Sequence, residues 1–132
     1  MGYTHYWGSK TPISPEVWAA ICADAKKLIA AFPPIIRDLD VDDEQIFFNG
    51  SCESFEFLRR GGWAWCKTRG EPYDRLVCAI LFVARQRYPG LAVGSDNELH
   101  RVRLWTDAIT WATEVLGRNL NVTNGHEMRC VE

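Results

Sequence analysis

The stretch QIFFNGSCESFEFLRRGGWAWCKTRGEPYD, residues 45–74, carries most of the strand signal of the chain. Strand-forming residues alternate in Gln45–Asn49, Ser54–Leu58 and Trp63–Thr68, and successive side chains of a strand point to opposite faces. Asn49-Gly50 and the paired glycines before Trp63 separate these runs, because glycine tolerates the backbone angles of tight turns. We therefore predict a three-stranded antiparallel meander.

Three other segments have apolar residues at the three- and four-residue spacing of an amphipathic helix. The first begins at Ser14-Pro15, where serine can cap a helix and proline loses no hydrogen bond, and extends to about Phe32. The second, from about Glu71 to Tyr88, is apolar on most sides, so we expect it in the core. The third extends from about Glu98 to Leu116 and should cover the sheet.

Two short segments complete the predicted sheet. Tyr3–Trp7 has the composition of a strand and belongs beside the meander, and Leu91–Val93 is a short apolar run before a turn. The resulting order, β-α-βββ-α-β-α, predicts a single α+β domain in which about three helices cover a mainly antiparallel sheet. Residues 118–132 have little periodicity and are expected to form an irregular tail.

An acidic segment, Ile35–Glu44, precedes the meander. Its acidic residues are Asp38, Asp40, Asp42, Asp43 and Glu44. The spacing lacks the glycine and the terminal glutamate of a calcium-binding EF-hand loop, so we predict a solvated connector.

Composition excludes several classes of function. The chain has 132 residues and a net charge of -2, and no apolar run approaches the roughly 18 residues that cross a bilayer. We therefore expect no membrane partner, and no broad attraction to nucleic acid. No secretory signal is recognisable at the start. The five cysteines are odd in number and lack paired spacing, which favours reduced thiols in a cytosol and predicts no zinc, other metal or cofactor.

Two arrangements would suit catalysis. His5 and Cys66 lie on separate predicted strands and suggest a thiol-imidazole pair, although a buried, unreactive thiol is the more common situation. Glu53, Asp74 and Asp96 lie in turns or at helix starts and can converge at one end of the sheet for acid-base or metal-assisted hydrolysis. Helix capping explains Asp74 and Asp96 equally well.

Ligand binding is indicated by two neighbouring tripeptides. Cys66-Lys67-Thr68 and Pro72-Tyr73-Asp74 would combine a lysine, a hydroxyl and the free amides of a helix N-terminus into an anion site. No Walker or GxGxxG pattern is present. Aromatic residues on neighbouring strands can stack on a nucleobase while Asn49 and Glu53 bond its edge, unless these rings serve only the core. The aromatic residues concerned are Tyr3, Tyr6, Trp7, Trp63 and Trp65.

Five motifs together resemble a family of small uncharacterised proteins of bacteriophage and prophage genomes. The motifs are Met1–Trp7 (MGYTHYW), Asn49-Gly50 with Glu53-Ser54-Phe55, Cys66-Lys67-Thr68, Pro72-Tyr73-Asp74 and Ser95-Asp96. The opening heptapeptide is the most specific of them. The family pattern has glycine after Ser-Ser-Asp, whereas this chain has Gly94-Ser95-Asp96-Asn97 and so departs from it on both sides of Ser95-Asp96.

The resemblance implies a phage-type origin and a cluster of polar motif residues. Small phage proteins often act against host defence, and some sequester nucleotide-derived immune messengers without cleaving them. Together with the aromatic and polar residues above, this predicts a ligand-binding sponge in the cytoplasm of an infected bacterial host, rather than an enzyme. The residues expected to bind its nucleotide-like ligand are Tyr3, His5, Tyr6, Asn49, Glu53, Trp65, Lys67, Thr68, Tyr73, Asp74 and Asp96.

Two alternatives remain open. One is a small hydrolase or transferase that acts on a nucleotide derivative and uses Glu53, Asp74 or His5 as acid-base groups. The other is a protein inhibitor whose exposed aromatic residues cover a host defence enzyme. A homo-oligomer is compatible with each of these functions.

Overall fold

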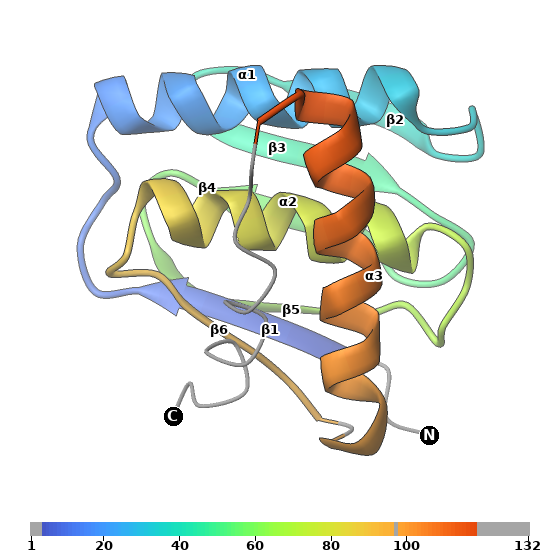
Figure 1. Cartoon of the computed structure of the whole chain (residues 1–132). Coiled ribbons are helices and arrows are strands. Elements are labelled where there is room, and N and C mark those ends of the chain that lie inside the picture. Colours follow the sequence, from blue (N-terminus) through green and yellow to red (C-terminus); the bar gives the residue numbers. More distant parts are fainter. Residues whose placement is uncertain (1–3, 97, 119–132) are drawn as a thin grey trace.

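A computed structural model of the chain describes residues 4–96 and 98–118, with side chains for all of these except 98–104. Tyr3 and most of the expected tail lie outside the described residues. The elements of the described part are β1 (Thr4–Ser9), α1 (Pro15–Ala31), β2 (Arg37–Val41), β3 (Gln45–Asn49), β4 (Phe55–Leu58), β5 (Gly62–Lys67), α2 (Asp74–Arg87), β6 (Ala92–Ser95) and α3 (Glu98–Leu116). They confirm the predicted α+β class (Figure 1).

The strands of the described residues divide into two antiparallel sheets, with the orders β5-β1-β6 and β2-β3-β4. The predicted β3-β4 hairpin is confirmed, with Phe48 opposite Phe55. The predicted meander is wrong at its third strand, because β5 pairs with β1 and not with β4. Gly61 and Gly62, at φ 94° and 86°, redirect the chain between β4 and β5, and the carbonyl of Arg59 accepts from the Ile13 amide instead of continuing a ladder to β5.

The segment predicted to be an acidic connector contains β2, so that prediction is wrong for Arg37–Val41. This strand pairs with β3, although Arg37 to Asp40 are all exposed. Its alternation is short, with Leu39 and Val41 next to aspartates, and the five acidic residues of the segment outweigh this strand signal. The turn after it is stabilised by Asp42, whose Oδ1 accepts from the Glu44 and Gln45 amides at 2.8 and 3.0 Å.

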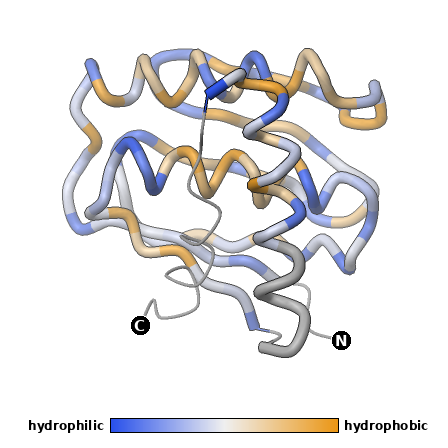
Figure 2. The backbone as a smooth tube through the Cα atoms, viewed as in Figure 1, coloured by the Kyte–Doolittle hydropathy of each residue, from blue (hydrophilic) through white to orange (hydrophobic). Residues whose placement is uncertain are grey.

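The three helices of the described part form where the sequence predicts them. Ser14 caps α1 by accepting from the Val17 amide at 3.3 Å, and Pro15 occupies the first turn. The middle helix, α2, contacts both α1 and α3, and Figure 2 shows apolar residues along its middle. Its residues from Leu76 to Ala84 are buried, as expected for a core helix.

Aromatic side chains connect the two sheets with the helices. Trp7 of β1 packs on Phe55 of β4 at a centroid distance of 5.0 Å, and Trp18 of α1 packs on Phe57 at 5.3 Å. Trp63 and Trp65 of β5 point the other way and are 65% and 66% exposed. No helix in the described part of the chain combines the length and apolarity needed to span a bilayer.

Candidate functional site

A cluster of polar side chains is buried where β1, β6 and α2 meet. His5 is the centre of this buried cluster: its Nε2 lies 2.6 Å from Asp74 Oδ1, and its Nδ1 lies 2.5 Å from Ser95 Oγ. Thr68 donates its hydroxyl to Asp74 Oδ1. The Cys78 sulfur lies 3.5 Å from His5 Nε2 and 3.6 Å from Asp74 Oδ2. All five residues are buried.

Strand register and helix periodicity bring these residues together. In the first sheet, His5 lies directly opposite Ser95 on β6 and Cys66 on β5. Asp74 and Cys78 are four residues apart on α2, and positions i and i+4 share one face of a helix. Because α2 lies over β1 (Figure 1), that face meets His5.

The carboxylate of Asp74 carries the charge of the buried cluster. Burial alone would raise the pKa of Asp74, but the hydrogen bond and charge of His5, with hydrogen bonds from Thr68 and Cys78, outweigh it and hold the pKa below its ordinary value. The ionised carboxylate of Asp74 accepts a hydrogen bond from Nε2–H of His5. Nδ1 of His5 is hydrogen-bonded to the Ser95 hydroxyl, which makes a continuous Ser95-His5-Asp74 relay of hydrogen bonds.

Trp105 of α3 covers this cluster. Its ring lies 5.4 Å from the His5 ring, tilted by 57°. The indole Nε1 of Trp105 is buried and has no hydrogen-bond partner among the described residues. Buried N–H groups are usually paired, so an unsatisfied donor such as this one, beside the relay, is unusual.

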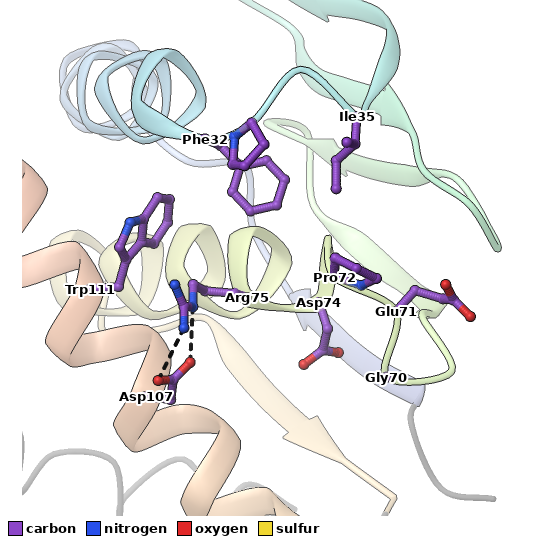
Figure 3. Close-up of a pocket in the computed structure, with 10 residues that line it drawn as sticks. Phe32, Ile35, Gly70, Glu71, Pro72, Asp74, Arg75, Asp107 and Trp111 are labelled. Carbon is purple, nitrogen blue, oxygen red and sulfur yellow. Dashed lines mark hydrogen bonds and ion pairs between the residues drawn. The ribbon is translucent and has the colours of Figure 1, made fainter.

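A pocket of about 370 Å³ lies beside the buried cluster (Figure 3). It is bounded by the segment after α1, by the start of α2 and by one face of α3. Its lining residues are Phe32, Pro33, Ile35, Gly70, Glu71, Pro72, Asp74, Arg75, Asp107 and Trp111. Asp74 belongs both to this lining and to the buried cluster, so it connects the two.

The pocket combines apolar walls with an excess of carboxylates. Phe32 and Trp111 meet edge to face at 5.8 Å, and the Arg75 guanidinium lies 6.0 Å from the Trp111 ring. Arg75 also donates to both oxygens of Asp107, at 2.9 and 3.4 Å. Since Glu71 and Asp74 add two more carboxyl groups, the lining has three acidic residues and one basic residue.

A second group of motif residues connects the segment between β3 and β4 to the end of β5 and to the residue before α2. Tyr73 is buried and donates its hydroxyl to the Glu53 carbonyl at 2.7 Å. The Glu53 carboxylate accepts from the Lys67 amide at 2.8 Å. Asn49 donates to Asp38 at 2.7 Å, across the β2-β3 pair. These contacts are structural, and none of these side chains lines the pocket.

Other predicted ligand residues lie on the outer face of the first sheet. Trp65 and Lys67 are exposed there, and Tyr6 lies against Gly94 of β6. Asp96 is exposed and accepts from the Thr4 amide at 3.2 Å. Because Lys67 is exposed while Thr68 is buried against Asp74, the structure does not bring these two residues to one anion.

The structure corrects the predicted thiol-imidazole pair. The thiol nearest to His5 is that of Cys78, whereas Cys66 contacts the Tyr73 hydroxyl at 3.9 Å and the Glu53 carbonyl at 3.5 Å. Burial raises the pKa of Cys66 to about 12 and raises that of Cys78 well above its ordinary value, so both thiols are protonated at neutral pH.

The predicted convergence of Glu53, Asp74 and Asp96 is also not found. The three carboxylates accept hydrogen bonds from different groups: the Lys67 amide, the buried cluster and the Thr4 amide. Nor does Asp74 cap α2 with its side chain, since no side-chain cap exists at that end.

Of the predicted ligand residues, the structure therefore joins His5, Thr68 and Asp74 at one site. Sequence reasoning missed Cys78 and Ser95 of the buried cluster, and Phe32, Arg75, Asp107 and Trp111 of the pocket. The four-residue spacing of Asp74 and Cys78 is a signal that indicates a shared helix face. The pocket residues come from three distant segments and have no such signal.

Comparisons with protein-family models, with curated proteins and with solved structures find no match for this chain.

Proposed function

We propose that the protein binds a small organic molecule in the pocket beside Asp74 and retains it without chemical change. The observation that carries this proposal is a pocket of about 370 Å³ with aromatic and proline walls and an ionised carboxylate at its edge. Small-ligand pockets have volumes of about 300–1,000 Å³ and combine apolar walls with a few polar groups.

The lining supports a planar ring that carries amino groups, such as a nucleobase. Rings pack well against aromatic side chains, here Phe32 and Trp111, and carboxylates accept hydrogen bonds from amino groups. With three acidic residues and one arginine, the lining repels a phosphate. A nucleotide would therefore insert its base and leave its phosphate in solvent, and sequestration of a nucleotide-derived immune signal is the biological form of this proposal.

Two matched substitutions test the pocket. Ile35 lines it and is 46% exposed, while Leu39 is 49% exposed and lies outside the lining. Ile35→Trp should fill the pocket without disturbing the core, and Leu39→Trp is its control. In calorimetric titrations with the four common nucleosides and with inorganic phosphate, wild type and Leu39→Trp should bind a nucleoside but not phosphate, and Ile35→Trp should bind at least tenfold more weakly.

Equal binding by wild type and Ile35→Trp would place the ligand elsewhere. If no nucleoside binds and none changes the melting temperature, the proposal that the pocket binds a nucleobase is refuted. Mass analysis of the mixture after denaturation should return the nucleoside intact.

A second candidate function, hydrolysis or group transfer, is favoured by the Ser95-His5-Asp74 relay. Hydrogen-bonded chains of this composition activate nucleophiles in many hydrolases. Here Ser95 and His5 are buried, and Asp74 is the member that lines the pocket, so Asp74 would act as the base and His5 would position it. Asp74→Asn would then abolish turnover of a substrate while retaining its binding, and a changed mass of the incubated ligand would decide for this function.

A further inference from the structure

We infer that His5, Asp74 and Cys78 bind one divalent metal ion of the zinc type. Among the described residues, their ligand atoms lie within 4.8 Å of one another, and all three side chains are buried. An imidazole nitrogen, a carboxylate oxygen and a thiolate sulfur are the three ligand types that zinc accepts in proteins. Clusters of exposed acidic groups are common without an ion, but this set is buried and chemically mixed.

The distances to the sulfur fit coordination. Zinc binds these atoms at about 2.0–2.3 Å, so two ligands of a tetrahedral ion lie roughly 3.3–3.8 Å apart. The Cys78 sulfur is 3.5 Å from His5 Nε2 and 3.6 Å from Asp74 Oδ2. The 2.6 Å contact of Nε2 with Oδ1 is a hydrogen bond. The metal ion takes the place of the proton on Nε2 of His5, and the other carboxylate oxygen, Oδ2 of Asp74, binds the ion.

The charges of the ligands balance the ion. A divalent cation with one carboxylate and one thiolate is neutral overall, which suits a site where His5 and Cys78 are fully buried. When the ion binds, the thiol proton of Cys78 is released to solvent, and the proton on Nε2 of His5 moves to Nδ1, so the imidazole stays neutral.

Two hydroxyl groups orient the ligand side chains by hydrogen bonds to atoms that do not bind the ion. Ser95 Oγ lies at the second ring nitrogen of His5, and with Nε2 on the ion it accepts from Nδ1–H. Thr68 donates to the Asp74 oxygen that the ion does not take. Metal-binding histidines and carboxylates are typically oriented by such partners. This arrangement uses the whole buried cluster.

The pocket gives the ion a path to the site, because Asp74 lines it. The absence of paired cysteines predicts no metal, but this ligand set does not need them. It combines an i, i+4 pair on α2 with a histidine 69 residues earlier than Asp74. The inference does not depend on the proposed function, since none of its steps uses the pocket ligand.

Cobalt titration tests the site. Tag-free protein is stripped with a chelator and titrated with Co²⁺, whose bond to a thiolate gives a charge-transfer absorption. One Co²⁺ ion per chain should bind and produce this absorption band, and added Zn²⁺ should displace the Co²⁺ and remove the band. The band should be lost in Cys78→Ser and kept in Cys66→Ser, the matched control, since both thiols are fully buried. Ser95→Ala keeps all three ligands and should weaken binding about 10–100-fold.

Absence of the thiolate band in folded wild type would overturn the inference, and so would retention of the band in Cys78→Ser. If Cys78→Ser does not fold, the Ser95→Ala titration and native mass spectrometry of wild type with Zn²⁺ decide the matter. Wild type without a bound ion, or Ser95→Ala with unchanged affinity, would then refute the site. Nucleoside titrations in the presence of the chelator report on the pocket alone, so the two proposals can fail separately.

Discussion

Gly50 lies so close to the ring of Tyr73 that a side chain has no room there. A Cβ on Gly50 would be 2.3 Å from two ring carbons of Tyr73, far inside van der Waals contact. The ring cannot move easily, because Tyr73 is buried and its hydroxyl donates to the Glu53 carbonyl. Asn49-Gly50 thus acts less as a hairpin turn than as the surface on which Tyr73 packs.

We therefore predict that Gly50→Ala destabilises the protein. Overpacking of this kind costs roughly 1–3 kcal/mol in free energy of unfolding. Urea unfolding of the variant would measure it, with Ser51→Ala, at an exposed neighbouring position, as the control. An unchanged midpoint in Gly50→Ala would show that Tyr73 can give way.

At the scale of the element, β2 depends on its turn, since four of its five side chains are exposed. Asp42 Oδ1 accepts from two backbone amides of that turn, whereas the carboxylate of the adjacent Asp43, also exposed, takes no part in these hydrogen bonds. Besides its ladder and its turn, the strand is held mainly by exposed side-chain hydrogen bonds such as that from Asn49 to Asp38.

Asp42→Ala should therefore lower the free energy of unfolding by about 1 kcal/mol, because its hydrogen bonds to the turn are lost. Asp43→Ala should stay within about 0.5 kcal/mol of wild type. Hydrogen exchange of the β2 amides, measured beside the unfolding curves, should accelerate in Asp42→Ala alone. Equal effects of the two substitutions would contradict a specific role of the turn.

At the scale of the whole molecule, the buried carboxylate of Asp24 joins α1 to α2 and to the end of α3. Asp24 of α1 accepts from Arg87 of α2 at 2.9 and 3.3 Å, and from Arg118, just after α3, at 2.9 and 3.0 Å. Burial would raise the pKa of Asp24, but the hydrogen bonds and charges of Arg118 and Arg87 outweigh it and lower the pKa below its ordinary value of 3.8.

A carboxyl group whose pKa is lower in the folded than in the unfolded protein stabilises the fold at pH values above its pKa in the unfolded protein. That contribution is lost as the pH falls below 3.8 and through the folded pKa. Asp24→Asn should lower the free energy of unfolding by about 2 kcal/mol at neutral pH, because charged hydrogen bonds are lost. Urea unfolding as a function of pH should show the difference from wild type vanishing in acid.

Asp107→Asn is the matched control for this pH dependence. Its ion pair with Arg75 is exposed, so the loss should be no more than about 1 kcal/mol. A difference between Asp24→Asn and wild type that persisted in acid would show that packing, and not charge, gives Asp24 its effect.

The sequence predicted most of the fold, because helices and half-buried strands repeat their apolar residues with fixed periods. Ser14 and Pro15 marked the start of α1, and the all-round apolar segment after Tyr73 proved to be the core helix. Two features of the fold were predicted wrongly: β2, whose short alternation of Leu39 and Val41 lies among acidic residues, and the partner of β5. Which strands pair depends on the direction of the turns and on contacts between residues that are far apart in the sequence. The sequence of a single strand contains neither.

For the candidate site, the sequence selected His5, Thr68 and Asp74 as residues with chemistry, and it left their arrangement open. Their contact depends on the packing of α2 over β1, which joins positions that are distant in the chain. The pocket of Phe32, Arg75 and Trp111 likewise exists because three segments meet. Local periodicity determined the elements of this protein, whereas burial and long-range contacts, which only the tertiary structure contains, decided which polar groups share a site.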